Sequence, residues 1–411
     1  MSRFLLGAAT AAHQIEGNNI NSDAWAMEQM AHSTSIDKSG ICLDGYNRYE
    51  EDIRLLAKAG LNAYRFSIEW ARIEPEEGEF SETDIEHYRK VLECCQKYGI
   101  EPIVTLHHFT SPIWLIQKGG WENVGTIECF ARYCAYVVEM LGKYMHYVCT
   151  INEANIGLGI TSVVKKLTGG TLQVGMNVEE MLKGTAESQR ENIEAFGTAS
   201  PAVFLGPRTE NGDKIIIDAH LAAKKAIKAI CSDLQVGLTL SLHDVQSVPG
   251  GEQNARAEWE EEFLHYVPFL KDDDFIGVQN YSRKVFDAAG ELEPQQDKLL
   301  LQTGYEYCPA ALGKVVQKVY ETLKLPILVT ENGVATDDDD LRCQFIDKAF
   351  EGVQNCIKEG IPVKAYLHWS LLDNFEWQKG FAVTFGLIAV DRTTQRRVPK
   401  RSLYHLGSYA E

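Results

Sequence analysis

Two glutamates, Glu153 and Glu331, each lie at the end of an apolar stretch of the sequence. The first ends the run Val-Cys-Thr-Ile-Asn-Glu, and the second lies in Ile-Leu-Val-Thr-Glu-Asn-Gly. A carboxylate in such a place is costly to bury unless it is paired or takes part in chemistry. A pair of carboxylates suits glycoside hydrolysis, in which one protonates the leaving oxygen and the other meets the oxocarbenium-like centre. If the reaction retains configuration, we expect the two carboxyl groups to lie about 5–5.5 Å apart.

Other residues with suitable chemistry follow the ends of other apolar segments. Trp369 and Trp377 offer flat apolar faces against which a sugar ring can lie. Amide, imidazole and carboxylate groups that can bind sugar hydroxyls are those of Gln14, His108, Asn152 and Glu376. We therefore expect these side chains at the same rim as the two glutamates.

Other interpretations of some positions stay open. Because side chains alternate along a strand, only one of His107 and His108 can point inward, and we expect His107 to lie behind the site. Arg65 and Glu69 form a buried structural pair, or else they orient the nucleophile. A metal site at the two histidines has little support, because no H-E-x-x-H spacing occurs. We expect neither a metal nor a cofactor.

Eight short apolar segments without strict polar alternation predict buried parallel strands that position these residues. The segments are 4–10, 63–70, 102–108, 147–154, 236–242, 275–281, 326–333 and 363–372. Glu153 and Glu331 then belong to the fourth and seventh strands, roughly across the mouth of a barrel. Polar residues at the carboxyl ends of barrel strands point into that mouth.

Stretches with helical periodicity separate the strands, and glycine follows several of them, as is typical of helix ends. They are 46–59, 84–98, 126–144, 213–231, 254–269, 307–323 and 341–359. The alternation predicts an α/β protein with a single (β/α)₈ barrel, which spans residues 1–411 and carries long loops at its C-terminal face. A doubly wound open sheet is the alternative, but no G-x-G-x-x-G follows the first strand.

Two stretches interrupt this alternation. Residues 157–212 form an atypical insertion after the fourth strand, with a helical piece near 178–195, and residues 287–303 predict a polar loop. We expect Asn155, Ile156 and Leu158 to contact the leaving group of a substrate. The acidic run 337–340 predicts a solvated entry to a helix.

Composition limits the class of partner. The formal net charge of −18 argues against nucleic acid and anionic membranes, and it fits a neutral small-molecule substrate. The ten cysteines include no C-x-x-C pair, which favours thiols in a reducing cytoplasm. The apolar start of the chain predicts a first buried strand rather than a signal peptide, and no segment approaches the length of a membrane span. Assembly into a homo-oligomer is an open possibility.

Six stretches match the motifs of a known family. They are Ala8–Gly17, Tyr64–Trp70, Thr105–Phe109, Thr150–Glu153, Thr330–Gly333 and His368–Trp377, and they occur in the family's order. On these residues the chain resembles glycoside hydrolase family one, the β-glucosidase family, along nearly its whole length. The resemblance implies a retaining exo-β-glycosidase that acts on a small β-glycoside by double displacement.

The resemblance also implies a role for individual residues. Glu153 matches the acid/base, and Glu331 matches the nucleophile. Arg65 and Tyr281 match residues that contact the nucleophile, and Asn152 matches the residue that binds the hydroxyl beside the anomeric carbon. The matches to the remaining sugar-binding positions are Gln14, His108, Glu376 and Trp377 for the hydroxyls, Trp369 for the aromatic platform and Phe385 near the exocyclic group.

The chain departs from the family pattern in places that surround the leaving group. Ala154 stands where the family usually has proline after the acid/base. Gln279-Asn280-Tyr281 replaces the usual Asn-Tyr-Tyr. The stretch 157–212 does not match the usual loop, and the connection between the fifth and sixth strands is shorter than usual. These departures leave the catalytic pair intact but alter the surroundings of the aglycone.

Three other functions remain as alternatives. A 6-phospho-β-glycosidase would carry a serine and a downstream lysine and tyrosine after the eighth strand, where Glu376-Trp377 stands here. A transglycosidase would share every residue named above. A catalytically silent sugar-binding protein would need neither Glu153 nor Glu331.

Overall fold

Eight parallel strands form a closed barrel in the computed structural model, which describes residues 3–167, 186–294 and 297–410. Their order is β1-β10-β9-β7-β5-β4-β3-β2, and β1 pairs with both β10 and β2. The strands are β1 Leu5–Ala9, β2 Ala63–Ser67, β3 Glu101–His107, β4 Tyr147–Ile151, β5 Gln235–Ser241, β7 Phe275–Gln279, β9 Ile327–Asn332 and β10 Val363–Trp369. Closure confirms the predicted (β/α)₈ barrel and excludes the open sheet, which would leave two edges unpaired.

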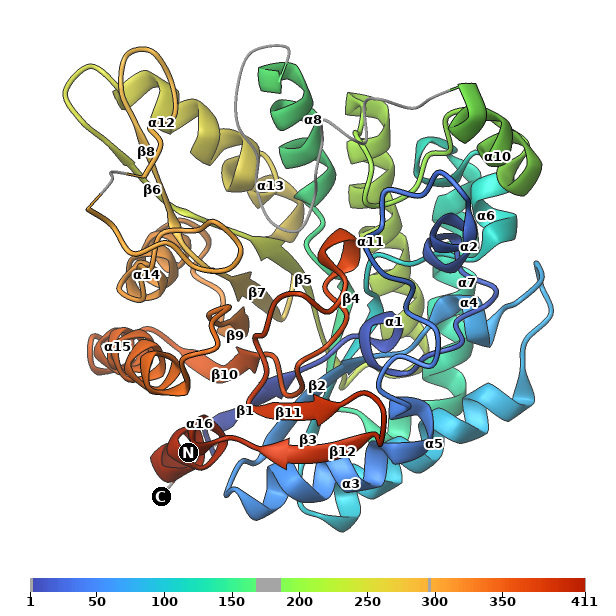
Figure 1. Cartoon of the computed structure of the whole chain (residues 1–411), viewed down its shortest axis with the longest axis horizontal. Coiled ribbons are helices and arrows are strands. Elements are labelled where there is room, and N and C mark those ends of the chain that lie inside the picture. The colour runs from blue at the N-terminus through green and yellow to red at the C-terminus, as the bar shows by residue number, and fades with distance from the viewer. Residues whose placement is uncertain (1–2, 168–185, 295–296, 411) are drawn as a thin grey trace.

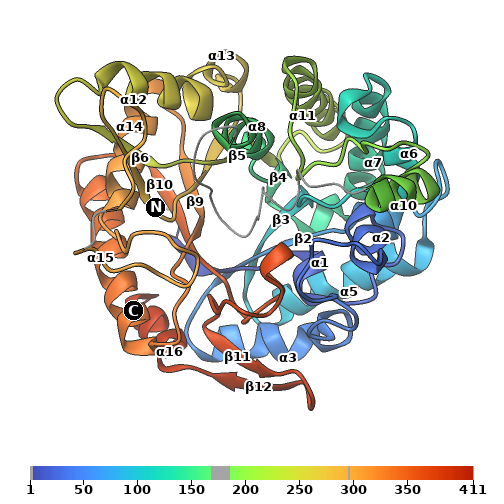
Figure 2. The same ribbon diagram turned by 45° about the horizontal axis from the view of Figure 1, so that its top comes forward.

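All eight predicted strands are present, and they lie inside a ring of helices (Figure 2). They are buried almost throughout because helices cover the outside of the barrel and side chains fill its inside. Each strand ends one to three residues earlier than predicted; β4, for example, ends at Ile151. The polar residues that follow, such as Asn152 and Glu153, therefore lie in the loops at the mouth.

Helices surround the barrel (Figure 1). Several of them begin with side-chain caps. The hydroxyls of Ser81 and Thr209 accept hydrogen bonds from the first turns of α5 and α11. The helices are α1 Ala12–Ile15, α2 Asp23–Gln29, α3 Gly45–Lys58, α4 Trp70–Ile73, α5 Glu82–Lys97, α6 Ile113–Gln117, α7 Gly125–Leu141, α8 Ile156–Leu167, α10 Ala186–Phe196, α11 Glu210–Ile230, α12 Glu252–Trp259, α13 Val267–Leu270, α14 Ala311–Leu323, α15 Asp339–Lys358 and α16 Arg401–Gly407.

The predicted helix 254–269 is not continuous. It consists of α12, a π-helical turn at Glu260–Leu264, and α13. Pro268 lies at the start of α13 and has no backbone N–H to continue the helical ladder, which accounts for the break. Of the helical piece expected near 178–195, α10 covers the last part, and residues 178–185 lie outside the described residues.

Two short sheets and a C-terminal helix were not predicted. β6 Asp244–Ser247 pairs with β8 Arg283–Phe286, and β11 Ile388–Asp391 pairs with β12 Arg396–Pro399. β12 lies beside α3 (Figure 1), where Arg397 Nε donates to Asp52 Oδ1 at 2.8 Å in a buried ion pair. These elements are too short to show a clear period in the sequence.

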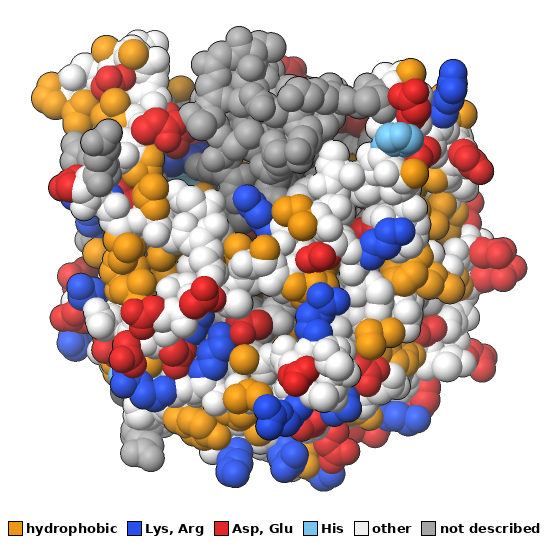
Figure 3. Space-filling view, viewed as in Figure 1, with side chains coloured by type: hydrophobic (Ala, Val, Ile, Leu, Met, Phe, Trp, Pro, Cys, Tyr) orange, Lys and Arg blue, Asp and Glu red, His pale blue; other side chains and the backbone are white. Residues whose placement is uncertain are grey.

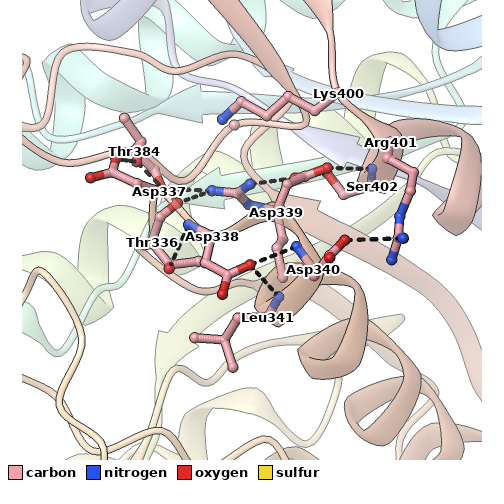
Figure 4. Close-up of polar contacts among 12 residues, drawn as sticks. Thr336, Asp337, Asp338, Asp339, Asp340, Leu341, Thr384, Lys400, Arg401 and Ser402 are labelled. Atoms are coloured by element: carbon pink, nitrogen blue, oxygen red, sulfur yellow. Dashed lines mark hydrogen bonds and ion pairs between the residues drawn. The ribbon is translucent and has the colours of Figure 1, made fainter.

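The acidic run Asp337–Asp340 begins α15 and ties it to the C-terminal helix (Figure 4). The Asp338 carboxylate accepts hydrogen bonds from two backbone N–H groups of the first turn, at 2.9 and 3.0 Å. The Asp339 carboxylate accepts from the backbone N–H and the hydroxyl of Ser402, at 2.9 and 2.6 Å. The run is the predicted helix entry, and it also fastens α16 to the barrel.

Acidic and basic side chains are interspersed over the described part of the face in Figure 3. The net charge of −18 is therefore not gathered into one acidic patch on that face. Within the described ranges, no helix is both long and apolar enough to cross a membrane.

Candidate active site

One pocket at the mouth of the barrel brings together most of the predicted site residues. Gln14, His108, Glu153, Tyr281, Glu331, Trp369, Glu376, Trp377 and Phe385 all line it. Arg65 and Asn152 lie directly behind and contact its lining through hydrogen bonds. Residues that are more than 300 positions apart in the sequence meet here because parallel strands end at the same face.

Glu331 is held at both of its carboxylate oxygens. Arg65 Nη1 donates to Oε1 at 2.6 Å, and the Tyr281 hydroxyl donates to Oε2 at 2.5 Å. Burial raises the pKa of Glu331, while Arg65 and Tyr281 oppose that rise by stabilising the charged form. The alternative pairing of Arg65 with Glu69 is wrong, because Glu69 accepts instead from Thr110 Oγ1 at 2.7 Å.

Glu153 differs from Glu331 in its hydrogen-bond partners. Burial raises its pKa to about 8, and the negative charge of Glu331 adds to the rise. The groups that hold Glu331 charged, the Arg65 guanidinium and the Tyr281 hydroxyl, make their hydrogen bonds to Glu331 and Asn152 rather than to Glu153. At neutral pH Glu153 therefore keeps its proton. The hydrogen bonds from Arg65 and Tyr281 favour the charged form of Glu331.

Asn152 is fixed by a network of side chains from four strands. Its Oδ1 accepts from Arg65 Nη2 at 2.6 Å and from Gln279 Nε2 at 2.7 Å. Its Nδ2 lies 3.3 Å from His108 Nε2. Gln279, which is one carbon longer than the family's usual asparagine, thus reaches Asn152 directly. The network holds the amide rigidly between the two glutamates and the histidine.

Glu376 lines the pocket beside Trp369 and Gln14. Trp369 Nε1 donates to its Oε1 at 3.1 Å, and Gln14 Nε2 lies 3.4 Å from its Oε2. Burial raises the pKa of Glu376 to about 8, although these two donors lower it. Within the described ranges, Gln14 Oε1 is buried and has no hydrogen-bond partner, so it can accept from a bound hydroxyl.

Aromatic rings stack near Glu376. His108 stacks on Trp369 with ring centroids 5.7 Å apart, and His13 stacks on Trp377 at 5.7 Å. Burial lowers the pKa of His13, but its ion pair with Glu28 outweighs that effect and raises the pKa above its usual value. The rings form a rigid apolar surface of the kind on which a sugar packs.

His107 lies behind the pocket, as strand alternation predicted. Its Nε2 lies 3.1 Å from Ser111 Oγ, and its ring packs against Trp121 and Phe204. Burial lowers its pKa to about 3, which keeps the ring neutral. In the described part of the chain, no group of three or more His, Cys, Asp or Glu is arranged to hold a metal ion.

The outer part of the pocket is lined by the start of α8. Asn155, Ile156, Gly159 and Ile160 contribute to it, whereas Leu158 does not. The prediction for Leu158 was wrong because positions 156, 159 and 160 share one face of a helix and 158 lies off that face. Asn155 is also structural, since its amide bonds to the backbone of Ser241 at 2.6 and 3.0 Å.

Thr239 on β5 was missed by the sequence analysis. Its Oγ1 accepts from Glu153 N at 3.0 Å, and its carbonyl accepts from Ala154 N at 3.1 Å. The only available signal was a hydroxyl within an apolar strand, two residues before Ser241, so that both side chains point into the barrel. Thr239 anchors the backbone on which Glu153 is carried.

The model of the family described as Glycosyl hydrolase family 1 matches residues 1–202 and 265–411. The chain belongs to glycosyl hydrolase family 1. A solved structure titled beta-glycosidase BGL167 is 42% identical, with a TM-score of 0.91 over 99% of this chain and 96% of that one. The apo structure of a beta-glucosidase 1317 is 40% identical, with a TM-score of 0.90 over 99% and 98% of the two chains. Beta-glucosidase A of Thermotoga maritima is 29% identical, over 98% of this chain and 95% of that protein.

As a family 1 glycosyl hydrolase, the protein is an enzyme that hydrolyses glycosides. The family model leaves residues 203–264 unmatched. The model thus matches residues 157–202, most of the expected insertion at 157–212. The unmatched stretch includes α11, β5 and the elements up to the π-helical turn. The region in which this family 1 chain departs from the common pattern thus borders the side of the pocket on which Glu153 lies.

Proposed function

We propose that this enzyme is a retaining exo-β-glucosidase in which Glu331 is the nucleophile and Glu153 is the acid/base. The observation that carries the assignment is the asymmetry of the two carboxyl groups. Glu331 receives hydrogen bonds from Arg65 and Tyr281, which favour its charged form. Glu153 has a pKa raised to about 8 and so carries a proton to donate.

The difference between the two carboxyl groups assigns each of them a role in the two steps of the reaction. The charged Glu331 attacks the anomeric carbon and forms a glycosyl ester while protonated Glu153 donates its proton to the departing oxygen. Glu153, now ionised, takes a proton from water, which attacks the ester and releases the sugar with its original configuration. Asn152 precedes Glu153 in the sequence and shares Arg65 with Glu331 as a hydrogen-bond partner. It is suited to bind the hydroxyl beside the anomeric carbon.

The glycone end supports an unphosphorylated sugar. Glu376 is a carboxyl group held by Trp369 and Gln14, and it offers a phosphate no positive charge to bind. Gln14 and His108 complete the set of hydroxyl partners, and Phe385 lies edge-on to Tyr281 with ring centroids 5.9 Å apart. We propose glucose as the glycone because relatives described as beta-glucosidases match nearly the whole chain.

Covalent trapping tests the nucleophile. A slow 2-fluoro-β-glucoside with a good leaving group is expected to inactivate the enzyme with time and to label Glu331, which peptide mass spectrometry detects. The same reagent in the α configuration serves as the control and leaves the protein unlabelled. A label on another carboxylate would overturn the assignment.

Chemical rescue tests the acid/base. Glu153→Ala is expected to retain cleavage of an activated dinitrophenyl glucoside and to lose cleavage of a poor leaving group, because only the latter needs a proton. Added azide is expected to restore turnover and to yield the β-glucosyl azide. An α-azide, or no rescue with the activated substrate, would contradict the assignment.

The compartment is a further part of the proposal. The ten cysteines are unpaired, and eight of them are buried. Buried thiols behave as small apolar side chains and persist where the surroundings are reducing. They support a cytoplasmic location, which fractionation of the native host would test.

A further inference from the structure

Arg208 places a buried cation against the backbone that follows Glu153. Its Nη1 donates to the carbonyl oxygen of Ala154, and its Nη2 donates to the carbonyl oxygen of Phe204 at 3.2 Å. The guanidinium also lies over the Phe204 ring, 4.7 Å from its centroid. Only 5% of Arg208 is exposed, so the side chain is held in this one arrangement.

The backbone around Arg208 is fixed as well. The Thr161 hydroxyl accepts from Arg208 N at 2.6 Å and lies 2.9 Å from the carbonyl oxygens of both Gly157 and Arg208. Gly157 packs so closely that a Cβ there would lie 2.5 Å from the guanidinium. Arg208, Thr161 and Gly157 thus lock the start of α8 to the segment that leads into α11.

Glu153 needs such support because its own backbone is in an unfavourable conformation. Its φ of 41° lies in the left-handed region, which costs a residue other than glycine about 1–3 kcal/mol unless the surroundings hold it. Thr239 holds the N–H groups of Glu153 and Ala154. Arg208 holds the next carbonyl, on the far side of the same two peptides.

Ala154 takes part in this support. A proline at this position would have no N–H, so the bond from Ala154 N to the Thr239 carbonyl depends on the alanine. Hydrogen bonds from Thr239 on one side and Arg208 on the other thus hold this segment. Arg208 also lies within residues 203–264, the stretch that the family model leaves unmatched.

We infer that Arg208 is a positioning residue for the acid/base: through the Ala154 carbonyl it holds the Glu153 backbone so that the carboxyl points at the leaving oxygen. This inference rests on the proposed role of Glu153. Arg208 does not touch the reacting atoms, and its loss moves the proton donor rather than removing it. A displacement of about 1 Å in such a group can lower a rate about 10²-fold.

A buried arginine elsewhere in the barrel provides a matched control. Arg342 is also fully buried and also donates to two backbone carbonyls, those of Thr336 and Thr384. It lies on α15, after the strand that bears Glu331, and not beside Glu153. Its replacement removes two similar bonds to backbone carbonyls, and also an ion pair with Asp339, without touching the backbone of the acid/base.

The experiment measures kcat/KM for a series of aryl β-glucosides whose leaving groups range from dinitrophenol to phenol. Arg208→Lys, Arg208→Gln and Gly157→Ala are compared with Arg342→Lys, Glu153→Ala and the parent enzyme. For the phenyl glucoside, we expect kcat/KM of the Arg208 variants and of Gly157→Ala to fall on the order of tenfold to a hundredfold. On the dinitrophenyl glucoside they should lose less than about threefold, because that substrate needs little protonation.

Arg208→Lys keeps a donor for the Ala154 carbonyl and should lie between the parent enzyme and Arg208→Gln. Arg342→Lys should lower the midpoint of thermal unfolding and change kcat/KM by the same factor for all substrates. If Arg208→Gln does not fold, Gly157→Ala decides, since it displaces the guanidinium while every polar group remains.

Two results would overturn the inference. If the Arg208 variants and Gly157→Ala lower kcat/KM by the same factor for all substrates, as Arg342→Lys does, then Arg208 contributes to stability alone. If Glu153→Ala itself shows no dependence on the leaving group, the proposed acid/base is wrong. A dependence seen in Glu153→Ala and absent from the Arg208 variants refutes only the positioning role.

Discussion

The carboxyl groups of the pocket (Glu153, Glu331 and Glu376) and those of the acidic run Asp337–Asp340 differ in their hydrogen-bond partners. Two of them, Glu331 and Asp338, lie close together in the sequence around the end of β9. Glu331, within the strand, receives its hydrogen bonds from Arg65 and Tyr281, side chains of distant segments. Asp338, at the start of α15, receives its bonds from the backbone N–H groups of Asp340 and Leu341. The partners of the first exist only in the folded barrel, whereas those of the second are local.

The carboxyl groups of the pocket and those of the acidic run also differ in whether hydrogen bonds outweigh the effect of burial. Burial raises the pKa values of Glu153 and Glu376 to about 8, so both groups can exchange a proton near neutral pH. Burial also disfavours the charged form of Asp339, but the hydrogen bonds from Ser402 outweigh burial and lower the pKa of this carboxyl group. Carboxylates that cap a helix stabilise the fold, and carboxylates buried in the pocket are available for chemistry.

The largest expected effect separates the two sets by activity. Glu331→Gln is expected to abolish hydrolysis of an aryl β-glucoside, a loss on the order of 10⁴-fold or more, because a neutral amide cannot form the glycosyl ester. Asp340→Asn makes the same chemical change in the acidic run and should leave kcat and KM unchanged. Equal losses in both variants would mean that Glu331 acts only through stability.

The dependence on pH tests the raised pKa of Glu153. Because the protonated form is the acid, kcat/KM should fall about tenfold per pH unit above a pKa of about 8. The charged form is also disfavoured in the folded protein, so the stabilising contribution of neutral Glu153 is lost as pH rises through about 8.

Glu153→Gln provides the control for that pH dependence. It should remove the part of the stability loss that belongs to Glu153, as thermal unfolding measured at pH 6 and pH 9 would reveal. A basic limb that stays unchanged in residual activity after this substitution would assign the titration to another group, with Glu376 the first candidate.

A smaller effect is expected at Glu376, which we propose binds the hydroxyls of the glycone. Hydrogen bonds between neutral groups are worth about 0.5–1.5 kcal/mol each, and Glu376 can bond more than one hydroxyl, so Glu376→Ala should lower kcat/KM for β-glucosides about tenfold. Competition between a glucoside and its 6-phospho analogue completes the measurement. A parent enzyme that prefers the phosphorylated sugar would refute the role given to Glu376.

The smallest effect is expected in the acidic run. Asp338→Ala removes the cap of α15 and should cost about 1 kcal/mol of stability, which lowers the thermal midpoint by roughly 1–2 °C. The activity per folded molecule should not change. A loss of activity larger than the loss of folded protein would show that the loop after β9 couples the acidic run to the pocket.

The sequence by itself determined the barrel, because eight buried strands and their helices each leave a local periodic pattern. It also determined the two glutamates, because each ends an apolar run and lies in a motif of the family. Short elements such as β6, β8, β11 and β12 left no such pattern. Their pairing depends on segments that are distant in the sequence.

Only the tertiary structure decided what surrounds each group. The bond from Glu153 N to Thr239 joins residues 86 positions apart, and the bond from Arg208 to Ala154 joins residues 54 positions apart. Arg65 likewise paired with Glu331 rather than with nearby Glu69. Burial and hydrogen-bond partners are properties of three-dimensional neighbours, and these set the pKa of a carboxyl group and the direction in which it points.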